Sequence, residues 1–418
     1  MQRKKMENRG TWNRTSPKPG PKDAAPKIVG PIPPDLEGKK AYLENWVKEN
    51  RIPGKIQSWF TQPSKAETSD WRIHSQMLSK TNRVLSIEGP YKGAKPPKIV
   101  LDIDAQIRKP HLSKFRKSVL QIWFRATGDG RYGLAVQTIL HSAEATREFK
   151  TFMNYLKHEH SSDILCCHQI QIRPVQAFDP AHPSPDSQIE LHKGFGNEFL
   201  PIAGTGQMFH IADWTPRAKE PWLALPKRIR EAIHPSKEDK FLECHAGPAY
   251  IAEALSPYFS ASYAVDQRNI PRQVPHVRMI RSTVEKDFFE KFFAGKGKEG
   301  KWTIYLDPPN GKSLGALVSK MAACRPERIL LNSSNLSVAT TEIKKFRNEG
   351  YMLRKIIPLD LEPGSNTFQT LFLFVPDRAG LLGRKTPHPG KVIKRIEKPA
   401  TDMSNAAETI RFTQKRRK

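Results

Sequence analysis

The stretch FLECHAGPAYIAEALSPYFSASYAVDQ, residues 241–267, decides the fold. It opens with an apolar run typical of a buried strand, the glycine at position 247 permits a tight turn, and residues 250–259 have the spacing of a helix. A second strand-like run, residues 262–266, follows. A strand, a helix and another strand in succession predict two parallel strands joined by a crossover helix.

The same alternation of strand and helix continues downstream. It ends in a pair of strands after residue 350. Such alternation predicts an α/β fold, a doubly wound parallel sheet with helices on both faces, in which ligands bind at the carboxyl ends of the strands. The predicted helices are 284–297, 312–324 and 338–350, and the predicted strands with their turns are 302–311 and 328–335.

Acidic residues close three of the predicted strands. Glu243 ends the first strand ahead of Gly247, and Asp266 ends the second. A glycine turn followed by an acidic strand end lets the backbone approach a nucleoside while a carboxylate accepts the ribose hydroxyls. Asp307 and Pro308 lie in the LDPPNG loop at the third strand end. These residues predict a nucleoside site, and the alternative is that they only shape the strand ends.

Residues 110–218 have the pattern of a compact α+β module. A helix is predicted behind a Ser142 cap, because apolar residues from Phe149 to Leu156 recur at i, i+3, i+4 and i+7. Strands are predicted at 118–126, 132–140 and 166–174. The preceding residues 35–109 are predicted to hold one core-packing helix, at 38–50, and irregular structure over 51–99.

The lead-in to this module, PHLSKFRKS, is basic and aromatic. Lys114, Arg116 and Lys117 surround Phe115. Such a mixture suits phosphate contact and base stacking, which makes the three cations candidate RNA-binding residues. The alternative is a solvated strand edge.

Much of the chain's charge lies near its ends. The 418 residues include 69 Lys and Arg against 42 Asp and Glu, a net charge of +27. Residues 1–30 carry eight basic and two acidic residues, and residues 384–418 carry eleven and three, so these two segments supply +14. Because both are also rich in Pro, Lys, Ser and Thr, we predict two extended basic arms, 1–34 and 381–418, that capture nucleic acid. The alternative is a role in solubility or sorting.

Hydropathy and cysteine content exclude other classes. No run approaches the roughly 18 apolar residues of a membrane span, so a soluble, intracellular protein is expected. The four cysteines include no CxxC pair, which predicts neither a disulfide framework nor a zinc site. No feature indicates DNA specificity.

Four segments, in order, resemble motifs of the S-adenosylmethionine-dependent RNA uracil-5 methyltransferases. The resemblance implies a Rossmann-like class I methyltransferase sheet at 219–380, behind the N-terminal α+β module. It also implies cofactor binding by Glu243, Gly247, Asp266, Asp307 and Pro308, with Asp307 in the target-base pocket. The segments are ELHKGFGNEFLPIAGTGQMFHIADWTP (190–216), FLECHAGPAYIAEALS (241–256), YLDPPNG (305–311) and the block from Ile329 to Phe374.

The sequence departs from that family where the chemistry is done. The family uses a cysteine nucleophile and a glutamate base; their positions fall on Ser334 and Gln369. A serine hydroxyl needs an adjacent base to attack, and an amide accepts no proton at neutral pH. The second loop glycine falls on Ala249 and a cofactor-contacting glutamine on Pro216. S-adenosylmethionine binding is therefore expected to be weak or lost, without any metal.

These observations predict an RNA-binding protein on a uracil-5 methyltransferase body that is catalytically inactive. Its expected partner is structured RNA, ribosomal RNA before transfer RNA, with ribosomal or assembly proteins beside it. An active RNA methyltransferase with altered chemistry and a protein scaffold are the alternatives. The basic start MQRKKMENRGTWNRTS favours mitochondria, whereas the final RFTQKRRK permits a nuclear or nucleolar location.

Overall fold

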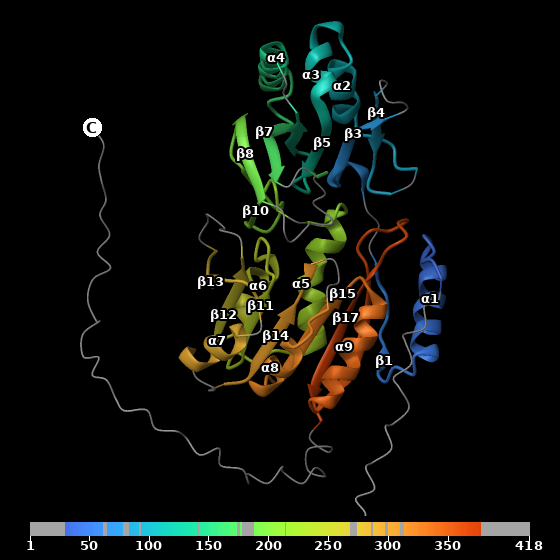
Figure 1. Cartoon of the computed structure of the whole chain (residues 1–418), viewed down its shortest axis with the longest axis vertical. Coiled ribbons are helices and arrows are strands. Elements are labelled where there is room, and N and C mark those ends of the chain that lie inside the picture. The colour runs from blue at the N-terminus through green and yellow to red at the C-terminus, as the bar shows by residue number, and fades with distance from the viewer. Residues whose placement is uncertain are drawn as a thin grey trace, which may run out of the picture. The chain divides into compact units, whose positions relative to one another are not determined.

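The structure is a computed structural model, shown in Figure 1. It describes residues 30–377 except 62–64, 78–82, 92, 140–141, 174–175, 178–187, 214, 268–273, 286, 297–299 and 310–312. The two basic arms thus lie almost entirely outside the described residues. No helix in the described part of the chain is long and apolar enough to cross a membrane.

The C-terminal half is built on a large sheet with the order β1-β16-β17-β15-β14-β11-β12-β13, and β2 also pairs with β16. The strands from β13 to β15 run parallel, and β17 is antiparallel to both of its neighbours. This confirms the predicted Rossmann-like sheet. The strands are β11 (Lys240–Cys244), β12 (Ala261–Asp266), β13 (Val277–Arg281), β14 (Trp302–Leu306), β15 (Arg328–Ser333), β16 (Tyr351–Asp360) and β17 (Gln369–Pro376).

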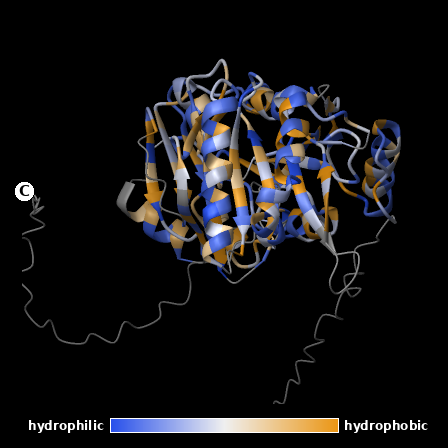
Figure 2. Ribbon diagram, turned by 90° about the horizontal axis from the view of Figure 1, so that it is seen from above, coloured by the Kyte–Doolittle hydropathy of each residue, from blue (hydrophilic) through white to orange (hydrophobic). Residues whose placement is uncertain are grey.

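Helices cover both faces of this sheet, as the alternation predicted. One face packs against α7 (Phe288–Lys296), α8 (Leu317–Ala323) and α9 (Leu336–Asn348). The other packs against α5 (Lys219–Ile233) and α6 (Tyr250–Leu255). Because both faces are covered, the central strands are almost wholly apolar, and orange segments recur along them in Figure 2.

Residues 35–61 extend the same sheet at its far edge. The predicted helix is α1 (Leu36–Glu49), capped by Asp35, and it buries Leu43 and Trp46 against the face that carries α9. Lys39 forms a fully buried ion pair with Asp360 at 2.8 Å. The core-packing role predicted for this helix is confirmed. Two short strands, β1 (Lys55–Ile56) and β2 (Phe60–Thr61), then pair in parallel with β16.

A second sheet of six strands has the order β4-β3-β5-β6-β7-β8. Its strands are β3 (Trp71–Met77), β4 (Arg83–Glu88), β5 (Val119–Ala126), β6 (Tyr132–Thr138), β7 (Ile164–Arg173) and β8 (Gln188–Phe195). One face packs against α2 (Lys98–Ile107), α3 (Ser113–Ser118) and α4 (Ala143–Glu159). The other shares a hydrophobic cluster with α5. A small pair, β9 (Phe199–Pro201) and β10 (Met208–His210), follows.

The structure confirms three predicted strands and the Ser142 cap, whose hydroxyl accepts a hydrogen bond from the Ala145 amide at 3.1 Å. The irregular structure predicted for 51–99 is wrong, because β3 pairs with both β4 and β5, and the sheet therefore begins at Trp71 instead of residue 110. The segment PHLSKFRKS is helical, not a strand edge.

Candidate functional site

The acidic residues at the predicted strand ends meet at one edge of the large sheet. Strand order reverses between β11 and β14, which is where doubly wound sheets bind ligands. Glu243 and Asp266 end β11 and β12, and Asp307 directly follows β14. Because these strands pair in parallel register, their carboxyl ends lie side by side. The structure thus brings the predicted cofactor residues together, with Gly247 and Pro308 in the adjoining loops.

The loop after β11 takes up three left-handed backbone conformations. His245, Gly247 and Ala249 have φ angles of 60°, 53° and 58°. Glycine adopts this region readily, whereas each residue with a Cβ atom costs about 1–2 kcal/mol there. The loop therefore keeps the backbone path of a glycine-rich loop, although two of its three left-handed positions carry side chains.

Hydrogen bonds tie this loop to the strand ends. The Gly247 amide donates to Asp266 Oδ2 at 2.9 Å, and the Ala252 amide donates to Glu243 Oε2 at 2.7 Å. Only 3% of Glu243 is exposed, and this burial raises the pKa of its carboxyl well above the usual range. The charges of Asp307 and Asp266 raise it further. The surroundings of Glu243 therefore favour the protonated form of its carboxyl.

The predicted base pocket is organised by a residue that the motif comparison had not singled out. Asn332, near the end of β15, donates from Nδ2 to Asp307 Oδ1 at 3.0 Å and to Gln369 Oε1 at 2.8 Å. The side chain is 2% exposed, and its Oδ1 atom has no hydrogen-bond partner among the described residues. No local sequence pattern singles it out, because its role depends on Asp307 and Gln369, which lie elsewhere in the chain.

Asp307 has an unusual acidity in this cluster. Burial raises the pKa of its carboxyl to about 7, although hydrogen bonds from Asn332 and Tyr305 act in the opposite direction. A carboxyl with this pKa exchanges protons near neutral pH, as a general acid or base requires. The ionisation of Asp307 therefore fits acid–base chemistry.

Ser334, at the family nucleophile position, is exposed in the turn between β15 and α9. Its neighbours hold the turn: the Asn335 amide donates to Ser333 Oγ at 3.2 Å, and Asn335 Oδ1 caps α9. No hydrogen bond within the described chain joins Ser334 Oγ to a base. Cys244 is fully buried in β11, where burial raises the pKa of its thiol. Cys324 follows α8 and precedes β15, at the amino ends of the strands, as predicted.

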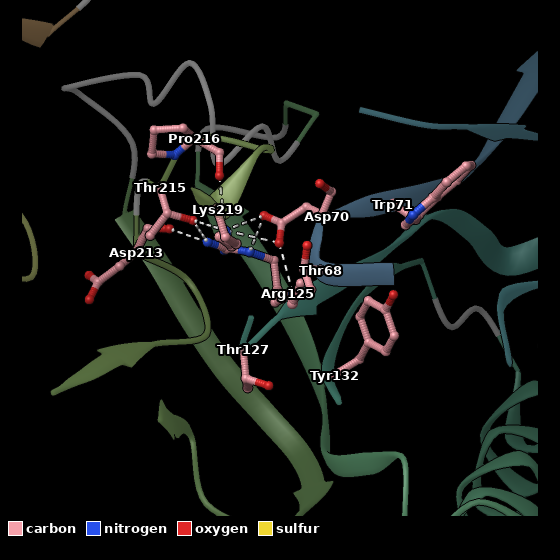
Figure 3. Close-up of polar contacts among 12 residues, drawn as sticks. Thr68, Asp70, Trp71, Arg125, Thr127, Tyr132, Asp213, Thr215, Pro216 and Lys219 are labelled. Carbon is pink, nitrogen blue, oxygen red and sulfur yellow. Dashed lines mark hydrogen bonds and ion pairs between the residues drawn. The ribbon is translucent and has the colours of Figure 1, made fainter. Parts of the chain in front are cut away.

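Pro216, at the position of the family's glutamine, belongs to a buried ionic network (Figure 3). Its carbonyl accepts a hydrogen bond from Lys219 Nζ at 2.9 Å. The same ammonium donates to Asp70 Oδ2 at 3.0 Å and to Thr215 Oγ1 at 2.7 Å. The segment that would approach the cofactor is thus held in place by Lys219.

Arg125, on β5, completes the network. Its guanidinium donates to Asp70 Oδ2 at 3.1 Å, to the Ile211 and Asp213 carbonyls, and to Thr215 Oγ1 at 2.6 Å. Asp70, Arg125 and Thr215 are all fully buried. Burial lowers the pKa of Lys219 to about 8. One carboxylate therefore faces two cations, and the contacts join the start of β3, β5 and the N-terminus of α5.

The backbone amides of the loop after β11 are largely engaged in hydrogen bonds. Pro248 has no N–H group, and the amides at 246 and 249 already donate to backbone carbonyls at 3.0 and 2.8 Å. His245 lies close enough to Asp266 for the carboxylate charge to act on its imidazole, whose pKa burial lowers. A neutral ring thus stands beside the carboxylate that would accept ribose hydroxyls. The described residues also include no group of His, Cys, Asp or Glu that could hold a metal ion.

The candidate RNA-binding cations lie on α3. Lys114 and Lys117 are exposed, and Arg116 donates from Nη1 to the Arg108 carbonyl at 2.8 Å. Phe115 is fully buried between Phe149 and Phe152. The stacking role expected for Phe115 is therefore wrong, because its ring belongs to the core. Phosphate contact by the three cations remains a prediction.

Comparison with known proteins places the chain beside RNA methyltransferases. No protein-family model matches it. An uncharacterized RNA methyltransferase of Chlamydia trachomatis is 23% identical over 189 residues, which are 43% of this chain and 47% of that protein. One of Streptococcus pyogenes is 24% identical over 149 residues, 34% of this chain and 32% of that protein. The chain thus matches less than half the length of these curated relatives.

A solved structure confirms the fold. The tRNA (uracil-54, C5)-methyltransferase of Pyrococcus abyssi, in complex with S-adenosyl-L-homocysteine, superposes with a TM-score of 0.53. The match covers 80% of this chain and 81% of that one at 12% identity, so it shows the fold alone. The chain is therefore similar in sequence to RNA methyltransferases and shares the fold of this solved methyltransferase.

Proposed function

We propose that this protein binds structured RNA and does not methylate it. The proposal rests on two residues. Ser334 stands where the resembling family has its cysteine nucleophile, and Gln369 stands where it has its glutamate base. The amide carbonyl of Gln369 is already bound by Asn332. A side chain that is neutral and engaged in this way cannot remove the proton from C5 of a uracil.

The cofactor loop supports the same proposal. Tight binding of S-adenosylmethionine is opposed by three features of this loop. Its backbone amides already donate to carbonyls, Pro248 has no N–H group, and positions 245 and 249 carry side chains. Isothermal titration of the full chain with the cofactor tests this directly. We expect no saturable heat up to millimolar ligand, and a micromolar dissociation constant would contradict the proposal.

A methylation assay tests catalytic inactivity. The full chain would be incubated with radiolabelled S-adenosylmethionine and with total RNA from cells that lack the protein. No 5-methyluridine above background is expected. Formation of 5-methyluridine that disappears in Ser334→Ala, and not in the neighbouring Ser337→Ala, would overturn the proposal. Ser337 lies in the first turn of α9 and serves as the matched control.

The pKa of about 7 at Asp307 favours a second candidate, an active RNA methyltransferase with altered chemistry on tRNA or rRNA. In that reaction a ring or ribose heteroatom of the RNA is itself the nucleophile, and Asp307 accepts its proton. Such an enzyme needs no cysteine. Methyl transfer that survives Ser334→Ala and is lost in Asp307→Asn would establish this candidate over the first.

The RNA that we propose is ribosomal, and the location mitochondrial, with the protein serving ribosome assembly or structure beside ribosomal or assembly proteins. The basic arms support anchorage on RNA, since about half of the charge excess lies in them. Ultraviolet crosslinking in cells and sequencing of the bound RNA tests this. Fragments dominated by mitochondrial rRNA are expected; nuclear precursor rRNA would favour the nucleolar alternative, and tRNA would contradict the rRNA assignment.

A further inference from the structure

A pocket of about 620 Å³ lies at the opposite end of the large sheet from the candidate site. Ser262, the second residue of β12, pairs with Val277 at the start of β13, so the pocket opens at the amino ends of these strands. Asp266 lies four positions after Ser262 on β12, which is about 13 Å at 3.3 Å per residue. The pocket is therefore distinct from the cofactor and base positions.

The lining of this pocket is basic and hydroxylated. Lys237, His276 and Arg278 line it, all three are exposed, and no acidic residue is among the lining residues. None of the three forms an ion pair with a carboxylate in the described part of the chain. The buried acid Asp239 is bound by Arg328 at 2.9 Å and by the Ser236 amide. The cationic charge is thus available to a ligand.

The pocket also contains an unsatisfied polar group. Ser262 is 2% exposed, and its Oγ atom has no hydrogen-bond partner among the described residues. A buried hydroxyl without a partner is uncommon, because leaving it unpaired costs about 1–3 kcal/mol. A ligand with an acceptor oxygen that enters the pocket removes this cost. The hydroxyl therefore points to an anion with several oxygens.

Beside the pocket lies an aromatic residue with a cation on its ring. Tyr258 is 37% exposed, and the Arg230 guanidinium lies 4.6 Å from its ring centroid. The guanidinium of Arg278, a lining residue, lies 5.7 Å from the ring centroid of Tyr263, which is not a lining residue. Cations interleaved with tyrosines are the combination with which proteins contact the phosphates and bases of RNA strands.

The charged residues that line the pocket, at the amino end of the sheet, are all cations. A polyanion is favoured at the amino end by simple Coulomb attraction. We propose that the phosphodiester backbone of an RNA strand binds in this pocket, with Lys237, His276 and Arg278 on its phosphates and Ser262 as a hydrogen-bond donor.

This inference rests on the proposed RNA binding and assigns it a second surface. One RNA-binding surface would lie at the carboxyl ends of the strands, and the second at their amino ends. A protein with two such surfaces bridges two RNA segments. Bridging is the work of a structural component or assembly factor, whereas an enzyme that turns over needs one site. The pocket thus also gives a physical reason for a role without catalysis.

The test compares two double charge reversals in the full chain. Lys237→Glu with Arg278→Glu alters the pocket, and Lys344→Glu with Arg347→Glu is the control, because both control residues are exposed on α9 and lie outside the pocket. Each pair lowers the net charge by the same amount. The readout is fluorescence anisotropy of a fluorescein-labelled 20-nucleotide oligouridylate over a salt series, with thermal midpoints to check folding.

The pocket variant should bind at least about tenfold more weakly, with a salt slope reduced by about 1.4 for two lost phosphate contacts on a single strand. The affinity of the control variant for the probe should fall by less than about threefold. Equal losses in both variants would overturn the pocket while leaving RNA binding intact. Failure of the unaltered chain to bind the probe would overturn the proposed function and the pocket together. If the pocket variant unfolds, Lys237→Gln with Arg278→Gln replaces it under the same criteria.

Discussion

At the scale of single residues, Ala249 shows how far the cofactor loop has moved from a glycine loop. Its φ of 58° is strained for alanine, yet its methyl group is fully buried. Substitution by glycine relieves about 1 kcal/mol of backbone strain and loses about 1 kcal/mol of methyl burial. We therefore predict that Ala249→Gly is close to neutral in the free energy of unfolding.

The matched control is Ala252→Gly in the helix α6, which is also fully buried. There glycine loses the methyl burial and adds about 1 kcal/mol of backbone entropy cost. Urea denaturation should show Ala252→Gly to be less stable than Ala249→Gly by at least about 1 kcal/mol. Equal values would mean that the loop does not hold Ala249 in the left-handed region.

Asp307 makes stability depend on pH in a defined window. Its pKa is about 7 in the folded chain against an ordinary value of 3.8. Between these values unfolding releases a proton, so the contribution of this group to stability falls as the pH rises from about 4 to about 7 and is constant above. We predict that, when the pH rises from 4.5 to 8, the free energy of unfolding falls less for Asp307→Asn than for the wild type.

Asp129 supplies the control for that experiment. Its hydrogen bond with Arg131 holds its pKa at about 2, so its stabilising effect is complete above about pH 4. Asp129→Asn should therefore lower the unfolding free energy by the same amount at pH 4.5, 6 and 8. Parallel pH profiles of wild type and Asp307→Asn would show that Asp307 is ionised throughout.

Single residues also show the limit of motif comparison at the site. The acidic residues at the strand ends could be predicted, because the alternation of apolar strands and helices shows where each strand ends. A carboxyl that follows an apolar run therefore lies at the carboxyl end of a strand. Asn332 could not, because its role depends on the distance to Asp307 and Gln369 on two other strands. The burial of Phe115 was likewise set by α4, which follows it in the chain.

At the scale of elements, the strands that were predicted are those with continuous apolar runs. β11, β12, β14 and β15 are buried on both faces, so each is a continuous apolar run that can be recognised from the sequence by itself. β13, VRMIR, lies at the sheet edge with charged residues, and β3, WRIHSQM, alternates buried Trp71 and Ile73 with polar residues. Neither strand has a continuous apolar run, and the pairing of β3 with β5 joins segments that lie far apart in the chain.

The buried network of Asp70, Arg125 and Lys219 joins elements of the two sheets and should dominate their coupling. Removal of one partner from a buried ion pair costs about 3–5 kcal/mol. Asp70→Asn leaves two cations without a carboxylate, whereas Lys219→Met leaves a balanced pair of Arg125 and Asp70. We predict that Asp70→Asn destabilises by about 3–5 kcal/mol and Lys219→Met by clearly less.

Chemical denaturation measures both variants, and Asp104→Asn serves as the control because Asp104 forms a more exposed pair with Arg108. Such surface pairs contribute about 0–1 kcal/mol. A larger loss in Lys219→Met than in Asp70→Asn would mean that the Lys219 contacts to Thr215 and Pro216, and not charge balance, hold the segment.

At the scale of the whole molecule, the net charge of +27 divides into about half at the ends and half over the body. Residues 1–29 and 384–418 carry +14, and each contact between a cation and a phosphate of a single strand adds about 0.7 to the salt slope. We predict that removal of both segments lowers the affinity for the oligouridylate probe by at least about tenfold and makes it less salt-dependent. The thermal midpoint, measured in parallel, checks that the truncated chain still folds.

The pocket and the arms act on RNA additively if they contact different phosphates. The affinity of the truncated chain for the probe should then fall by a further factor of about ten when Lys237 and Arg278 are both changed to Glu. It should change little when Lys344 and Arg347 are both changed to Glu. A double-mutant cycle over truncation and pocket variant measures this, and distant independent sites add to within about 0.5 kcal/mol. Loss of the pocket effect on truncation would instead mean that the arms deliver the RNA to the pocket, so that the two surfaces bind one segment and do not bridge two.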